Sequence, residues 1–146
     1  MKNFLLQITN KLLPVQTVYA HCDVPCGIYD PHAAQLAAKT VLAMVQKINA
    51  LPKENPTVND RNSFVRMVLT KEQHAEACKR EILILWTDYF KAEHLEKFPD
   101  LHELVWKTTK LCSDNKRAVD EAKAQELIAA VDNIADIFAK TKSAVK

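Results

Sequence analysis

The chain has 146 residues, of which 48% are hydrophobic and 26% are charged, with a single glycine. This composition describes one globular domain and excludes a disordered, collagenous or membrane-spanning chain. Twenty basic side chains against eighteen acidic ones, with no basic run, also argue against nucleic acid as a partner. One glycine leaves few tight turns for a sheet, so we expect helices.

Residues 1–20 differ from the rest of the chain. They contain Lys2 and Lys11 but no acidic residue, and they end on the small residue Ala20. We expect a leader that a processing protease removes, which leaves residues 21–146 as the functional domain. Polar residues interrupt its apolar stretch, unlike the core of a secretory signal, so we predict a cytoplasmic protein with export as the alternative.

Residues 21–31 read His-Cys-Asp-Val-Pro-Cys-Gly-Ile-Tyr-Asp-Pro, the densest group of metal-ligating side chains in the chain. The proline and glycine beside the second cysteine allow a curled loop that brings the thiols of Cys22 and Cys26 to one centre. After removal of the leader, His21 would offer a free amine as well as its imidazole. Amine, amide and two thiolates suit a tetragonal nickel or copper ion, whereas a closed zinc site lacks a second cysteine pair. Alternatively, the cysteines form a small disulfide loop or stay free thiols.

Four segments carry helical periodicity, and they span residues 32–51, 58–91, 94–112 and 113–142. Pro99 marks the first turn of the third segment, and Ser113 is a candidate cap for the fourth. Their apolar stripes predict an all-α protein, an antiparallel four-helix bundle that follows an N-terminal metal-binding hook. The inward-facing residues of the first two stripes include Leu36, Phe64, Val65, Val68 and Leu69.

The second segment is longer than the first, so one of its ends should project beyond the bundle. We expect Trp86, Tyr89 and Phe90 either to meet another subunit at that end or to fill the core.

Other candidate ligands are isolated. Cys78 and Cys112 lie on apolar stripes of different helices, which is typical of small core residues. His32, His94 and His102 lack the spacing of a metal site, so we expect solvated surface or a structural hydrogen bond for each.

The order His-Cys-Asp-x-Pro-Cys-Gly-x-Tyr-Asp-Pro directly after a removable leader resembles the nickel hook of nickel-containing superoxide dismutases. The resemblance continues through residues 71–73, 85–91 and 94–102 and covers most of the functional domain. It implies a homohexamer of four-helix bundles with one nickel ion per subunit. It also implies an enzyme that converts superoxide into dioxygen and hydrogen peroxide.

By this resemblance, the metal ligands are the amine and imidazole of His21, the thiolate and backbone nitrogen of Cys22, and the thiolate of Cys26. The resemblance assigns the catalytic entrance to Asp23 and Tyr29. It also places Tyr89 and Lys91 near that entrance, where the ammonium group of Lys91 would attract the anion.

Two positions depart from the family pattern. A glutamate and an arginine that orient the ligand imidazole correspond here to Ala37 and His74. We hypothesise that His74, directly or through a water, takes over the orienting bond to His21; the alternative is an exposed helix residue. A different interpretation of the whole chain is a non-enzymatic nickel or copper carrier or sensor, which would need no entrance for an anion. A helical interaction module with incidental cysteines comes third.

Overall fold

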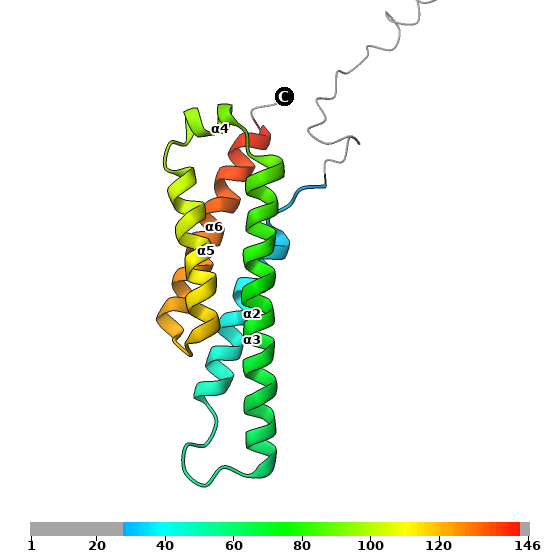
Figure 1. Ribbon diagram of the computed structural model, residues 1–146, viewed down its shortest axis with the longest axis vertical. Helices are drawn as coiled ribbons and strands as arrows, with labels where there is room; N and C mark the ends of the chain where they lie inside the picture. Colours follow the sequence, from blue (N-terminus) through cyan, green and yellow to red (C-terminus); the bar gives the residue numbers. More distant parts are fainter. Residues whose placement is uncertain (1–27, 144–146) are drawn as a thin grey trace, which may run out of the picture.

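The computed structural model describes residues 28–143, and within that range it contains helices and no strand (Figure 1). The elements in chain order are α2 (His32–Asn49), α3 (Val58–Ile84), the π-helix η1 (Leu85–Tyr89), α4 (Ala92–Lys97), α5 (Leu101–Arg117) and α6 (Glu121–Ser143). The long helices α2, α3, α5 and α6 pack in a ring in which α2 contacts α3 and α6, and α5 contacts the same two helices. The predicted four-helix bundle is therefore confirmed. No described helix is long and apolar enough to cross a membrane.

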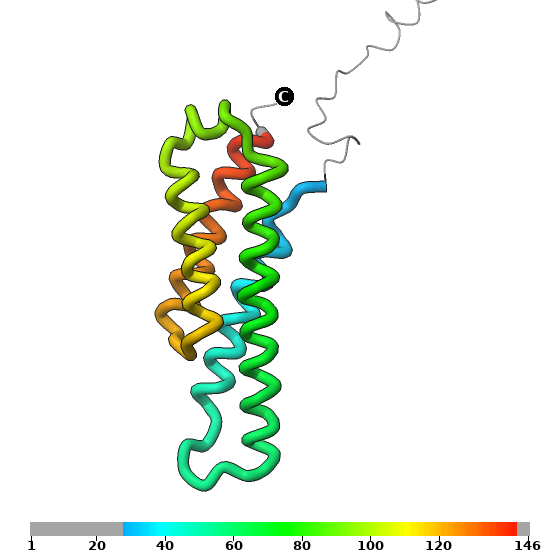
Figure 2. Tube along the Cα trace, viewed as in Figure 1, coloured from blue at the N-terminus to red at the C-terminus, as the bar shows by residue number. Residues whose placement is uncertain are grey.

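The bundle brings distant parts of the chain together at one end. The end of η1 and the C-terminal end of α6 lie at the end of the bundle that carries α4, and α2 starts in the same half of the bundle (Figure 2). The loop between α2 and α3 lies at the opposite end. The segment that follows the hook therefore enters the fold beside η1 and α6.

Helix α3 begins with a reciprocal cap. The Thr57 hydroxyl accepts a hydrogen bond from the Asp60 backbone N–H at 3.1 Å, and the Asp60 carboxylate accepts one from the Thr57 N–H at 2.8 Å. Each group satisfies a donor that the first helical turn leaves unpaired. This cap holds the end of α3 that extends beyond the other helices.

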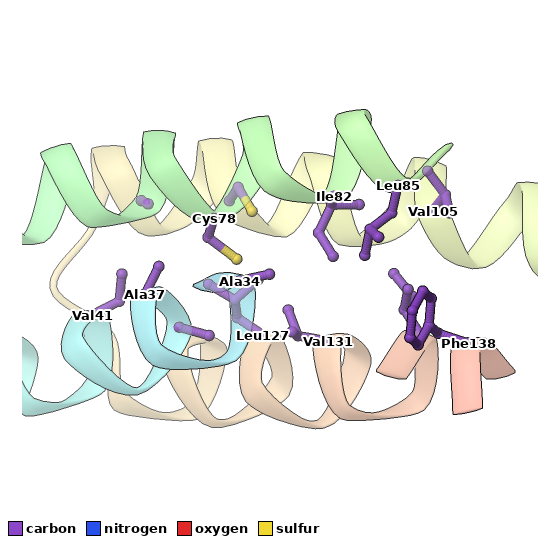
Figure 3. Packing of buried hydrophobic residues seen from close by; sticks show 14 of the residues in the cluster. Ala34, Ala37, Val41, Cys78, Ile82, Leu85, Val105, Leu127, Val131 and Phe138 are labelled. Carbon is purple, nitrogen blue, oxygen red and sulfur yellow. The ribbon is translucent and has the colours of Figure 1, made fainter. Parts of the chain in front are cut away.

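Small side chains and aliphatic residues from all four long helices form the core, as Figure 3 shows for part of it. Val41, Ile82, Leu127 and Val131 are fully buried there. Small residues such as Ala34 and Ala37 line the inner face of α2, and they allow close approach of its neighbours. Cys78 and Cys112 are also fully buried, so their predicted core role is confirmed.

The predicted stripes were wrong at several positions. Leu36 is 57% exposed because α2 instead buries a face centred on Ala34, Ala38 and Val41. Phe64, Val65 and Leu69 were also expected to face inward, and they are exposed as well. They lie on the N-terminal part of α3, which extends past the ends of α5 and α6 and so has fewer helices to pack against (Figure 1).

The projecting end of the second helix is therefore its N-terminal end, away from Trp86, Tyr89 and Phe90. Phe90 is buried, and the other two rings pack against the core. Of the two roles predicted for these three residues, the structure supports core packing.

The predicted boundary at Ser113 was also wrong. Ser113 lies inside α5, where its hydroxyl donates to the Thr109 carbonyl at 3.3 Å. The helical structure is interrupted at residues 118–120, which connect α5 to α6. At the start of α6, the Asp120 carboxylate accepts a hydrogen bond from the Lys123 N–H at 3.1 Å. The third predicted helix is in fact two, because α4 ends before Pro99 and α5 starts after it.

Candidate metal centre

The described chain begins at Ile28, two residues after Cys26, the last predicted ligand. His21, Cys22, Asp23 and Cys26 lie outside the described residues. Asp30 accepts the backbone N–H of His32 at 2.7 Å, which starts α2 directly after the hook. The residues that can be placed around the candidate centre are therefore those of the following segment and of the helices beside it.

Tyr29 is the predicted entrance residue that the structure describes. Its half-buried ring lies 5.9 Å from the ring of Tyr89, centroid to centroid, at a tilt of 54°. A small cavity of about 170 Å³ next to it is lined by Ile28, Tyr29, Asp30, Glu81, Ile84 and Leu85. The structure therefore brings Tyr29 and Tyr89 together, although 60 positions of sequence separate them.

The π-helix η1 determines where Tyr89 lies. The Phe90 N–H bonds to the Leu85 carbonyl at 3.0 Å, five residues back, where an α-helix would bond four residues back. The wider turn changes the register of the side chains, so that Phe90 is buried and Tyr89 faces Tyr29 and α6. Single π-turns inside helices are frequent at functional sites.

Three further residues surround Tyr89, and their sequence positions do not assign them to the site. The Tyr89 ring lies 4.4 Å from Phe138 and is stacked on His94 at 5.7 Å with an interplanar angle of 21°. Its hydroxyl is 2.9 Å from the Thr141 hydroxyl. The spacing of Phe138 and Thr141 on α6 indicates a shared face, but nothing in the sequence links that face to Tyr89.

Lys91 follows two residues after Tyr89, and it is exposed. Its backbone N–H donates to Nδ1 of His94 at 3.1 Å. His94 is buried and makes this hydrogen bond. Of the two roles expected for this histidine, the structural hydrogen bond is therefore confirmed, and a place on the solvated surface is wrong. His32 is exposed, while the His102 ring lies 5.5 Å from Trp86.

The two departures from the family pattern lie on adjacent helices. Ala37 is buried in α2 and carries only a methyl group, and His74 is half-buried on α3. His74 precedes Glu81 by seven residues, which places it roughly 10 Å along the helix from the cavity beside Tyr29.

The described residues offer no other metal site. No group of three or more His, Cys, Asp or Glu side chains among them is arranged to hold a metal ion. A hydrogen bond with the neighbouring Cys112 thiol, together with burial, raises the pKa of Cys78, so this thiol stays protonated and is a poor ligand. The donor set of the hook, with two thiols, an imidazole and an ionisable backbone nitrogen, fits nickel, because soft sulfur and strong nitrogen donors favour a tetragonal ion.

Comparison with known proteins decides the family. The model of the family described as nickel-containing superoxide dismutase matches residues 16–142. The chain belongs to this family. It is 42% identical over 132 residues to a nickel superoxide dismutase of Streptomyces coelicolor, covering 90% of this chain and 95% of that protein. A relative of the same name from Streptomyces seoulensis is 40% identical over the same shares.

Solved structures agree with this assignment. A native nickel superoxide dismutase structure has a TM-score of 0.73 at 39% identity, covering 84% of this chain and 99% of its own. Three further solved nickel superoxide dismutase structures, 36–38% identical with TM-scores of 0.71–0.74, replace a histidine at the first position, an aspartate at the third and a tyrosine at the ninth. This member of the nickel superoxide dismutases is therefore an oxidoreductase that uses nickel to convert two superoxide anions and two protons into dioxygen and hydrogen peroxide.

Proposed function

We propose that His21, Cys22 and Cys26 hold the nickel ion of this superoxide dismutase. The observation that carries this proposal is the clustering of two thiols and an imidazole within residues 21–26. Among residues 28–143, by contrast, no group of three or more His, Cys, Asp or Glu side chains is arranged to hold a metal ion. The ligand atoms are the amine and imidazole of His21, the thiolate and backbone nitrogen of Cys22, and the thiolate of Cys26. When bound, nickel supplies a one-electron couple between its divalent and trivalent states, which thiolate and amide donors bring into the range of superoxide.

Asp23 and Tyr29 form the entrance in this proposal. The family's solved variants replace a histidine, an aspartate and a tyrosine at positions one, three and nine, the spacing of His21, Asp23 and Tyr29. The position of Tyr29 against Tyr89 supports an entrance narrowed by two phenol rings. Such an entrance excludes larger molecules and limits attack of peroxide on the thiolates. The exposed Lys91 attracts the anion toward it.

Removal of residues 1–20 is the activation step. While Ala20 is attached, the nitrogen of His21 is an amide and cannot act as a basic amine ligand. A histidine at the first position of a solved relative supports a chain that begins at His21. A processing protease is therefore a partner of the precursor.

The assembly and location follow from the same proposal. A homohexamer with one nickel ion per subunit would cover exposed apolar side chains such as Phe64, Val65 and Leu69. A cytoplasmic location keeps Cys22 and Cys26 reduced for metal loading.

His74 takes over the orienting bond to the His21 imidazole in this proposal, directly or through a water. The methyl group of Ala37 can form no such bond, and His74 is the ionisable side chain at the other altered position. Replacing it (His74→Ala) should change the spectrum of trivalent nickel and lower activity, because a bond to the far ring nitrogen tunes a ligand imidazole. An unchanged spectrum and unchanged activity would reject this role.

Cysteine variants test the ligand set. In a chain that begins at His21, Cys22→Ser and Cys26→Ser should each reduce bound nickel to background and abolish dismutation, because serine provides no thiolate. Cys112→Ser is the matched control, since this thiol is buried in the bundle. Full nickel content in either hook variant would refute the assignment.

A nickel carrier or sensor is not favoured, because the matched family consists of dismutases. A carrier would release its metal rapidly to a chelator and would not consume superoxide. Slow metal release together with turnover is the expected result for the enzyme.

A further inference from the structure

Either oxygen could donate in the bond between the Tyr89 and Thr141 hydroxyl groups, and the second bond of Thr141 assigns the donor. The Thr141 hydroxyl donates its single proton to the Phe138 carbonyl at 2.7 Å. Its oxygen therefore accepts from Tyr89, 2.9 Å away, and the phenolic proton of Tyr89 points to α6. Because Thr141 is only 3% exposed, water does not compete well for this bond.

The Tyr89 ring is also held on its faces. Phe138 lies 4.4 Å from it and is labelled near the end of α6 in Figure 3, while His94 is stacked at 5.7 Å. The ring of Phe90 meets the ring of Tyr89 edge to face, with 5.3 Å between the ring centroids. Such ring pairs each add stabilisation beyond the burial of area, so the orientation of Tyr89 is strongly determined.

His94 connects this ring cluster to Lys91. Its Nδ1 accepts the Lys91 N–H, so that nitrogen carries no proton and the ring plane is fixed relative to the backbone of Lys91. One buried side chain therefore contacts the ring of Tyr89 and the backbone of the exposed lysine.

We propose that Thr141 and His94 are positioning residues of the entrance: Thr141 fixes the phenol of Tyr89 as a donor toward α6, and His94 fixes the backbone that carries Lys91. This inference rests on the proposed roles of Tyr89 and Lys91. It adds that the phenolic proton of Tyr89 is committed to Thr141, so Tyr89 shapes the entrance and does not supply a proton to the product.

Threonine variants test the first half. In a nickel-loaded chain that begins at His21, Thr141→Val removes the acceptor at nearly constant volume, and Thr141→Ser retains it. We expect Thr141→Val to lower kcat/KM about fivefold to tenfold, the effect of one lost hydrogen bond, with nickel content unchanged. Thr141→Ser should restore activity. The control is Thr108→Val on α5, where a fully buried hydroxyl also donates to a carbonyl of its own helix, that of Leu104, at 2.7 Å, but does not contact Tyr89.

A second readout does not depend on turnover. The chain that begins at His21 contains two tyrosines, Tyr29 and Tyr89, so ring-labelled tyrosine gives two sets of NMR signals that Tyr29→Phe assigns. Thr141→Val should shift the Tyr89 signals, whereas Thr141→Ser and Thr108→Val should leave them in place. Equal signals and equal kcat/KM in the two valine variants would overturn the role of Thr141.

Histidine variants test the second half. His94→Leu removes the acceptor for the Lys91 N–H, while the Oδ1 of His94→Asn reproduces it. We expect Lys91→Gln and His94→Leu both to flatten the dependence of kcat/KM on ionic strength, and His94→Asn to restore it. A full salt dependence in His94→Leu would refute this part.

The proposed function and the positioning roles can be refuted by different results. If Lys91→Gln itself leaves the salt dependence intact, or if the parent chain binds nickel without turnover, the proposed function is wrong. Suppose instead that the parent chain is active and Lys91→Gln flattens the salt dependence. If Thr141→Val then behaves like Thr108→Val and His94→Leu keeps the full salt dependence, the positioning roles alone are wrong.

Discussion

Replacing Lys71 by methionine should destabilise the bundle substantially. Lys71 is a lysine on α3 that is only 1% exposed, and its ammonium group donates to the backbone carbonyls of Asn115 and Lys116 at the end of α5, the latter at 2.9 Å. The Lys71→Met variant keeps the length and volume of the side chain but leaves these two carbonyls without their donor. Lys71 therefore ties the middle of α3 to the C-terminal end of α5.

The expected magnitude follows from these two bonds. Each unsatisfied buried carbonyl costs about 1–3 kcal/mol. Part of this cost is offset because the variant no longer has to desolvate a buried ammonium group. We therefore expect the free energy of unfolding to fall by about 2–4 kcal/mol. For a domain of this size, such a loss lowers Tm by roughly 6–15 °C. The control is Lys79→Met on the same helix, because the half-buried Lys79 has one bond, at 3.2 Å, to the Ser113 hydroxyl. It should lose less than about 1 kcal/mol.

The same lysine predicts a dependence on pH. Desolvation lowers the pKa of Lys71 from 10.5, so between its folded pKa and 10.5 the unfolded chain binds more protons than the folded one. The contribution of Lys71 to the free energy of unfolding therefore rises with pH between these two pKa values. Urea unfolding of the parent and of Lys71→Met at pH 7 and in the window below 10.5 measures both effects. A difference below about 0.5 kcal/mol at pH 7, or one that shrinks as the pH rises, would refute the reasoning.

Three further predictions address the core, the cap of α3 and the aromatic cluster. Cys78→Ala combined with Cys112→Ala should cost about 1–2 kcal/mol per site from lost packing and leave nickel content unchanged, as urea unfolding and metal analysis would show; loss of nickel would contradict a purely structural role. Hydrogen bonds from Thr57 lower the pKa of Asp60, so the stability they provide is lost as the pH falls through the folded pKa. Asp60→Ala should therefore destabilise the chain at neutral pH and matter less in acid, and an equal effect at both pH values would count against the cap. Phe138→Leu should loosen the Tyr89 ring, lowering activity while nickel content stays full; unchanged activity would show that this contact is dispensable.

Much of the fold follows from the sequence because the apolar periodicity of its helices is regular. The all-α bundle and the N-terminal limits of α2 and α3 at residues 32 and 58 agree with the pattern, since Pro31 and the Thr57 cap interrupt it sharply. Ser113 was misjudged because a serine inside a helix bonds back to its own turn and resembles a cap in sequence.

Other features depend on the assembled bundle. The exposure of Phe64 and Val65 reflects the different lengths of neighbouring helices, which a single stripe does not contain. The π-turn before Phe90 is invisible to a period of 3.6 residues, yet it sets the position of Tyr89.

The candidate site also contains residues that the sequence can propose and residues that only the folded bundle brings together. The ligands of the hook could be proposed from the sequence because their chemistry is local, with His21, Cys22 and Cys26 lying within six consecutive residues. The surroundings of Tyr89 could not, because His94 and Thr141 reach it from two other helices. Local spacing is therefore enough to propose ligands, whereas the residues that we propose to position an entrance emerge only from packing.

The most direct test measures bound nickel and superoxide decay in two chains that differ only in residues 1–20. The account predicts about one nickel per chain and rapid dismutation when the chain begins at His21, and neither in the full 146-residue chain, because the leader converts the ligand amine into an amide. Equal nickel content and equal activity in the two chains would contradict it.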